Sequence, residues 1–212
     1  MFEIVLFFVT VFVAIFSILN PIGAVPILVT LTEGYTREER ARVIKKSLMV
    51  AAGMLFGFML VGIYIFEGLS IGISDFQIAG GILVFKVAFD MMQGKTSNTK
   101  LTATEEEESL QKDSIGVVPL GTPLLAGPGS ITTAIIYFNL KSVTLYDRLA
   151  VIFAILAVLI ASFVILVYSA RIFEKIGKTG SLLLSRIMGL LIAAIGISFI
   201  VEGITSLVQS IA

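Results

Sequence analysis

Six long apolar segments alternate with short polar stretches along this chain. They lie at about 2–31, 43–66, 75–93, 115–139, 149–171 and 183–209. An α-helix needs about 20 residues to cross the hydrocarbon core of a bilayer, and four of the six segments have about that length. The pattern predicts an all-α membrane protein with six transmembrane segments.

The first and fourth segments are interrupted by proline and glycine. The first has about 30 residues, which would make a straight helix of about 45 Å, and it contains Pro21, Gly23 and Pro26. The fourth contains Pro119, Gly121, Pro123, Gly127, Pro128 and Gly129. Proline removes a backbone donor and breaks or kinks a helix. We predict breaks near Asn20–Gly23 and Gly127–Ser130, lying close together in space.

The two halves of the chain repeat each other. The third and sixth segments match at a spacing of 109 residues: Ile78, Gly80, Ile82 and Gly94 correspond to Ile187, Gly189, Leu191 and Gly203. Asn20–Gly23 precedes Gly127–Ser130 by 107 residues. Because each half has three crossings, the second half is inverted relative to the first, as in many secondary transporters. We expect repeats at 1–94 and 115–212, joined by a polar connector at 95–114.

Each predicted break offers groups that bind a ligand. Asn20 is suited to cap a helix that starts at Pro21, and such a start directs free N–H groups and a positive dipole end inward. The second break repeats this arrangement and adds hydroxyl groups. The candidate substrate-binding residues are Asn20, Pro21, Gly23, Gly127, Gly129, Ser130, Thr132 and Thr133. The alternative is that both breaks are ordinary proline kinks used for packing.

Composition agrees with a membrane protein and narrows its chemistry. Hydrophobic residues make up 57% of the 212 residues and charged residues 14%, against about 25% in a soluble domain. The chain has no cysteine and no histidine. Disulfides and cysteine nucleophiles are therefore excluded, and the commonest general base and metal ligand is missing. We expect no metal and no cofactor.

The basic residues are distributed unevenly between the two sides of the predicted bundle. Twelve of the 15 lie in or beside the loops that follow segments one, three and five, whereas only Lys141 and Arg148 lie on the other side. The positive-inside rule then places both termini outside. A cysteine at Thr104, in the connector, should resist an impermeant thiol reagent added to intact cells. Strong labelling at that position would reverse the orientation.

Three charged residues inside the segments are candidates for coupling. Lys86 and Asp90 lie four residues apart on one helical face and can pair; a structural ion pair and a role in coupling are both open. Glu202 lies about two turns from the outer end of the sixth segment. It can serve as a proton carrier or can reach the interface. Intramembrane charges are costly, at least about 2.5 kcal/mol each, and usually face a cavity or partner.

Three stretches together resemble the MarC family of inner-membrane proteins of bacteria and archaea. They are Asn20–Gly23 followed by Pro26, Gly127–Ile131, and the run Ile78–Ile82. The resemblance covers nearly the whole chain. It implies a multi-pass protein of the plasma membrane and, for one archaeal branch, transport of small neutral amino acids such as glycine and alanine.

The leading hypothesis is a secondary transporter of a small solute, coupled to H⁺ or Na⁺. Its expected partners are the small-molecule substrate and the lipid bilayer, with no nucleic acid; a homo-oligomer is left open. The alternatives are a membrane scaffold or regulatory subunit without transport, and an intramembrane enzyme using Ser130 with Lys86. We expect no enzyme activity, because Lys86 lies toward the cytoplasmic end and no third orienting group is apparent.

Overall fold

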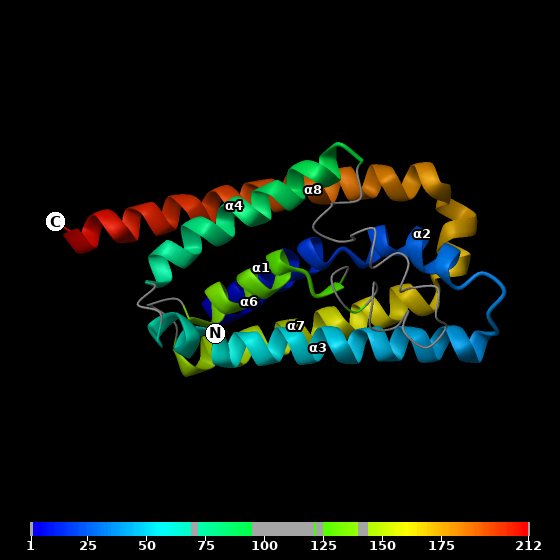
Figure 1. Ribbon diagram of the computed structural model, residues 1–212, viewed down its shortest axis with the longest axis horizontal. Helices are drawn as coiled ribbons and strands as arrows, with labels where there is room; N and C mark the ends of the chain where they lie inside the picture. Colours follow the sequence, from blue (N-terminus) through cyan, green and yellow to red (C-terminus); the bar gives the residue numbers. More distant parts are fainter. Residues whose placement is uncertain (1, 69–71, 95–120, 122–124, 140–143, 212) are drawn as a thin grey trace.

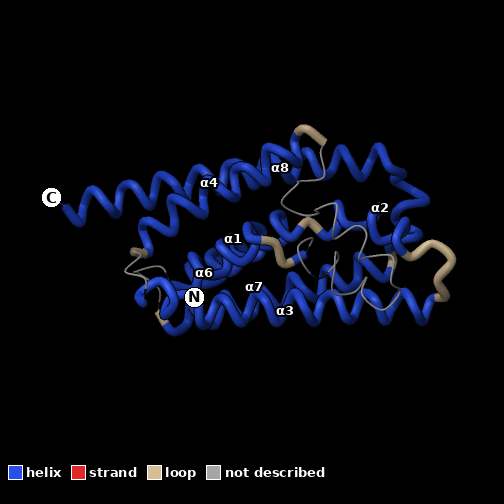
Figure 2. Tube along the Cα trace, viewed as in Figure 1, coloured by secondary structure: helices blue, strands red, loops and turns tan. Residues whose placement is uncertain are grey.

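The computed structural model describes residues 2–68, 72–94, 121, 125–139 and 144–211. Their regular structure is helical, without strands within those ranges (Figures 1 and 2). The helices are α1 Phe2–Leu19, α2 Pro21–Leu31, α3 Arg37–Gly68, α4 Ile73–Met92, α6 Pro128–Asn139, α7 Leu145–Val167 and α8 Ser169–Ile211. The all-α prediction is confirmed for the described residues, whereas the connector at 95–114 lies outside them.

The first long segment breaks where the sequence predicts. Helix α1 ends at Leu19 and α2 begins at Pro21, with Asn20 between them at a φ of 47°. Pro26 remains inside α2. In the fourth segment a helix also begins at a proline, because α6 starts at Pro128. The other prolines of that segment lie outside the described residues.

Four stretches of the described helices are long and apolar enough to cross a membrane. They are Phe2–Val29, Arg37–Gly62, Leu145–Val167 and Thr179–Gln209. Helix α4 has 20 residues but carries Asp75, Lys86 and Asp90, and the 12-residue α6 is too short by itself. These four spans correspond to the predicted segments one, two, five and six, and the six-segment count stays a prediction.

The helices form three layers, with the broken segments in the middle. Helices α4 and α8 lie side by side in one outer layer, and α3 and α7 form the other (Figure 1). Helices α1, α2 and α6 lie between them and contact both. Figure 1 also shows that α1 and α2 run opposite to α6, α3 opposite to α7, and α4 opposite to α8. The two breaks are therefore enclosed by other helices.

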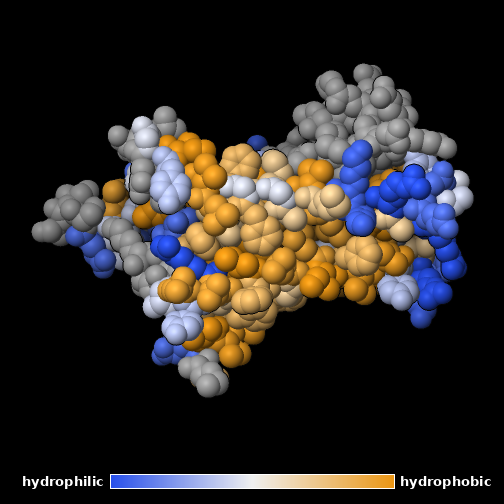
Figure 3. Space-filling model, turned by 90° about the horizontal axis from the view of Figure 1, so that it is seen from below, coloured by the Kyte–Doolittle hydropathy of each residue, from blue (hydrophilic) through white to orange (hydrophobic). Residues whose placement is uncertain are grey.

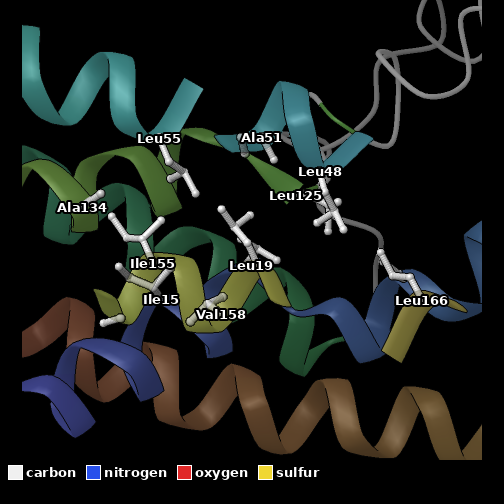
Figure 4. Close-up of a cluster of buried hydrophobic side chains, with 14 of the residues drawn as sticks. Ile15, Leu19, Leu48, Ala51, Leu55, Leu125, Ala134, Ile155, Val158 and Leu166 are labelled. Atoms are coloured by element: carbon white, nitrogen blue, oxygen red, sulfur yellow. The ribbon is translucent and has the colours of Figure 1, made fainter. Parts of the chain in front are cut away.

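Buried apolar side chains join these layers. The larger cluster connects the middle layer to α3 and α7 and includes Ile15, Leu19, Leu55, Leu125 and Ile155, all fully buried (Figure 4). A smaller cluster connects the middle layer to α4 and α8 and comprises Ile18, Val84, Val87, Ala88, Met91, Ile192 and Ala193. Leu19 and Ile18 face different clusters, so the end of α1 is held from both sides.

Helices α4 and α8 approach so closely that their backbones touch. A Cβ atom added at Gly81 would lie 2.6 Å from the carbonyl oxygen of Gly196, and one added at Gly203 would lie 2.8 Å from that of Ser74. Glycine is required at such positions because any side chain would collide with main chain. The glycines on these two helices therefore allow α4 and α8 to pack closely.

The small-residue pair on α3 meets no other helix among the described residues. Gly53 and Gly57 lie four residues apart on one face of α3, a spacing that favours close approach of two helices within one chain or between two copies. Both are exposed, and a Cβ atom added at either would meet no described atom within 4 Å. The spacing indicates where two helices can approach but not whether a partner is there.

The surface carries a broad apolar belt between polar ends. Large exposed hydrophobic side chains occur on every long helix, including Phe58, Phe85, Phe153, Phe163 and Leu190. Figure 3 shows hydrophobic residues across the middle of the molecule and hydrophilic residues toward the two ends. A soluble monomer rarely exposes contiguous apolar surface of this extent, so the belt fits the hydrocarbon core of a bilayer.

Helix α7 begins with a reciprocal cap that lies outside the predicted segment boundary. The Thr144 backbone N–H donates to Asp147 Oδ2 (2.9 Å), and the Asp147 N–H donates to Thr144 Oγ1 (3.3 Å). We expect Thr144→Ala to lower the free energy of unfolding by about 1 kcal/mol, because capping donors lose their partner. Thermal unfolding in detergent measures this. Thr205→Ala, an exposed residue that bonds only the preceding turn, is the control and should change stability less.

Candidate functional site

Asn20 holds the first helix break through both ends of its side chain. Its Oδ1 accepts a hydrogen bond from the Gly23 N–H (3.1 Å), and its Nδ2 donates to Ser185 Oγ on α8 (3.4 Å). The Oδ1 bond is the N-cap that the sequence predicts for α2. Asparagine suits the position further because it is one of the few residues that tolerates positive φ. Asn20 is 7% exposed, so this polar group lies inside the protein.

The break changes the hydrogen bonding of the preceding turn. Pro21 has no N–H to give to the Ser17 carbonyl. The Gly23 N–H, which an unbroken helix would direct to the Leu19 carbonyl, bonds to Asn20 instead. The end of α1 therefore presents backbone oxygens, and the start of α2 presents the positive end of a helix dipole. Acceptors for a cation and an attractive field for an anion lie within one turn of each other.

Ser185 belongs to this break, although the sequence gives no sign of it. It contacts Asn20 and also crowds Gly23, where an added Cβ atom would lie 2.7 Å from Ser185 Oγ. Serine is common on packed transmembrane helices, and Ser185 is 165 residues from Asn20 in the chain. No local pattern indicates such a contact. It became apparent only from the packing of α2 against α8.

The second break is organised by hydroxyl groups. Helix α6 begins at Pro128, and the Ile131 N–H donates to the Gly127 carbonyl (3.1 Å). The Ser130 hydroxyl lies within hydrogen-bond distance of the carbonyl oxygens of Leu125 (3.2 Å) and Gly127 (2.9 Å). Thr133 donates to the Gly129 carbonyl (2.8 Å). By donating to these carbonyls, the buried hydroxyls satisfy their own hydrogen-bonding groups, which would be costly to leave unpaired in a low-dielectric interior.

The two breaks meet in the middle layer, as predicted. A Cβ atom added at Gly129 would lie 3.2 Å from Ile18 Cγ2, so the first turn of α6 packs directly against the last turn of α1. Leu19 and Leu125, which precede the two helix starts, share one buried cluster (Figure 4). Sequence-predicted residues from segments more than 100 positions apart are thus brought together.

Thr132 differs from the other candidates because it faces α4. Its Cγ2 occupies the space that a side chain at Gly80 would need, only 2.1 Å from an added Cβ atom. The methyl group therefore packs, and Thr132 is 5% exposed. Pro21, Gly127, Gly129, Ser130 and Thr133 are buried, whereas Gly23 is half-buried.

The charged coupling candidates lie apart from the breaks. Lys86 is exposed and Asp90 is half-buried on α4, so they do not form the fully buried pair in which losing one partner leaves a strongly disfavoured charge. Glu202 is exposed on α8 and close enough to Tyr137 on α6 for an electrostatic interaction. Tyr137 also stacks edge-on against Phe199 at 5.4 Å. Lys86 and Asp90 thus lie four residues apart on α4, and Glu202 lies on α8 beside Tyr137.

Comparison with known proteins shows the family. A UPF0056 membrane protein of Methanocaldococcus jannaschii is 41% identical over 198 residues, covering 93% of this chain and 96% of that protein. The UPF0056 membrane protein YvbG of Bacillus subtilis is 37% identical, covering 93% and 94%. No solved structure matches. The model of the MarC family of integral membrane proteins matches residues 5–208, and the chain therefore belongs to the MarC family.

Proposed function

We propose that this protein is a secondary transporter of a small solute, with small neutral amino acids as the best-suited substrate class and H⁺ or Na⁺ as the coupling ion. The observation that carries the proposal is the meeting of two helix breaks, each with buried polar side chains, in the enclosed middle layer. Irregular backbone at depth is tolerated in membrane proteins where it lines a site or is buried in protein. A scaffold has no use for two such breaks.

The opposite directions of corresponding helices support an inverted repeat. Contacts between α4 and α8 pair Ser74 with Gly203, Gly81 with Gly196 and Ala88 with Gly189. If each residue of α4 is replaced by its repeat mate 109 positions later, and each residue of α8 by its mate 109 positions earlier, the same antiparallel register results. Val84 lies opposite Ala193 at the centre of this register. Both residues are buried in the same cluster. A pseudo-two-fold axis at this point would relate six segments in the manner of known transporters.

The chemistry at the breaks suits a zwitterion. The starts of α2 and α6 favour a carboxylate through N–H groups and helix dipoles, and the oxygens at the end of α1 and on Asn20 accept hydrogen bonds from an ammonium group. Ile18 and Gly129 leave little room beside them, which favours a small side chain. Lys86, Asp90 and Glu202 are the candidate residues for coupling transport to H⁺ or Na⁺.

Uptake by purified protein in liposomes tests the proposal. A panel of labelled amino acids is offered with and without imposed H⁺ and Na⁺ gradients. The expected result is accumulation of glycine or alanine above equilibrium under one gradient, abolished by the matching ionophore. Uptake equal to that of empty liposomes for every compound and gradient, with correctly inserted protein, would contradict a transporter of this class.

A further inference from the structure

A basic cavity lies away from the helix breaks, at the end of the molecule where α3 begins and α7 ends. It has a volume of about 200 Å³. Arg37, Arg40 and Ile44 of α3 line one side, and Val167, Tyr168 and Arg171 at the junction of α7 and α8 line the other. Candidate membrane spans begin at Arg37 and end at Val167. The cavity therefore lies at the boundary between the apolar belt and a polar end.

The cavity is cationic, and one nitrogen of its arginines has no hydrogen-bond partner among the described residues. Among the residues that the structure describes, its lining contains three arginines and no aspartate or glutamate. One guanidinium nitrogen of Arg40, Nη2, donates to the Thr32 carbonyl (3.3 Å), but its Nε is buried without a hydrogen-bond partner among the described residues. Arg171 lies over the Tyr168 ring at 5.7 Å. A buried donor without an acceptor is disfavoured, and the charge of the three arginines favours an anion as that acceptor.

Glu38 and Glu39, which are neighbours of Arg37 and Arg40 in the sequence, are not part of the cavity lining. Glu39, on the same helix turn, accepts hydrogen bonds from the Thr36 backbone N–H (2.8 Å) and hydroxyl (3.0 Å) as the cap of α3. Glu38 is exposed. The start of α3 also contributes the positive end of a helix dipole, which adds to the field of the arginines.

We propose that this cavity binds the phosphate group of an acidic membrane lipid. Arginine forms paired hydrogen bonds with phosphate oxygens, and the apolar walls formed by Ile44, Val167 and the half-exposed Tyr168 suit the glycerol and first acyl carbons. The polar end that contains the cavity, at the right of Figure 3, is the one that the charge bias assigns to the cytoplasm. Basic pockets on that side are where acidic headgroups bind.

Native mass spectrometry of delipidated protein tests the site. Phosphatidylglycerol is titrated onto wild type, onto the double variant Arg40→Gln with Arg171→Gln, and onto a control, Arg42→Gln with Lys45→Gln. The control pair is exposed on the same end of α3 and loses the same charge without lining the cavity. One basic residue near an acidic lipid contributes about fivefold in affinity. The cavity variant should bind about 25-fold more weakly, and the control should bind within about threefold of wild type.

Further measurements distinguish a lipid phosphate from a soluble one and control for misfolding of the variants. Phosphatidylcholine should bind at least tenfold more weakly than phosphatidylglycerol, and soluble glycerol phosphate at equal concentration should not displace the lipid. Arg171→Gln alone, at an exposed residue whose guanidinium lies over the Tyr168 ring, should fold normally and bind phosphatidylglycerol about fivefold more weakly. Equal losses in the cavity and control variants would overturn the site. Displacement by glycerol phosphate would overturn the lipid in favour of a soluble anion.

Discussion

Gly81→Leu is expected to prevent stable folding, because α4 and α8 touch through their backbones at this point. Even the Cβ atom of the smaller Gly81→Ala would lie 2.6 Å from the Gly196 carbonyl oxygen and 3.0 Å from the Ile200 nitrogen. Both are main-chain atoms that cannot rotate away. Overpacking of this kind typically destabilises by about 1–3 kcal/mol, so Gly81→Ala should already reduce the temperature at which the detergent-solubilised protein unfolds.

Gly57→Ala is the matched control for this prediction. Gly57 also lies inside a helix of the apolar belt, but nothing lies within 4 Å of its added Cβ atom. Alanine is the better helix former by about 0.5–1 kcal/mol, so Gly57→Ala should leave stability unchanged or raise it. An unfolding temperature for Gly81→Ala as high as that for Gly57→Ala would show that α4 and α8 do not pack as described.

Substitution of Asn20 is expected to lower the rate of transport by tenfold or more. Asn20→Ala removes the N-cap, at about 0.5–2 kcal/mol, and also places alanine at positive φ, at about 1–2 kcal/mol. In Asn20→Gly, glycine adopts a positive φ without strain. Replacing the asparagine N-cap by glycine lowers the stability by only a few tenths of a kcal/mol. Comparing the two variants therefore separates a loss of folding from a loss of substrate binding. Asn20→Gly should remain folded and still fail to transport, as measured by uptake into liposomes at matched protein incorporation.

A glycine substitution at the first break sharpens the same test. At the second break, Gly129→Leu would overpack against Ile18, Val84 and Val87, so a loss of transport could not be separated from a loss of stability. Gly23→Ala acts more locally, since its Cβ atom would force the Asn20 amide and the Ser185 hydroxyl to move. Uptake by Asn20→Gly and Gly23→Ala at the wild-type rate would show that the breaks serve packing alone.

The breaks were predictable because their signals are local. Proline removes a donor wherever it occurs, and Asn20 directly before Pro21 is a recognisable cap, which the structure confirms through the bond to Gly23. That the two breaks meet followed from the repeat rather than from any single residue. The contact with Ser185 was not predictable, because it depends on how α2 and α8 pack across the whole chain.

Helix ends differed from the predictions for a physical reason. Apolar segments mark what lies in the hydrocarbon, whereas a helix begins where its first N–H groups find a cap. Helix α3 starts at Arg37 rather than 43 because Thr36 and Glu39 cap it reciprocally. This capping pattern can be recognised from the sequence alone. Beyond the fifth segment, helix continues on both sides of Gly177, which alone departs from helical backbone with φ 66°.

Binding of labelled glycine and alanine to detergent-solubilised protein is the most direct test of the claim that the two breaks form a substrate site. Wild type is compared with Asn20→Gly and with Thr144→Ala, which alters the cap of α7 beyond the opposite end of α6 from the second break. Saturable binding of one amino acid per chain to wild type and Thr144→Ala, lost in Asn20→Gly, is the predicted result. Equal binding to all three proteins would place the substrate elsewhere and contradict the account.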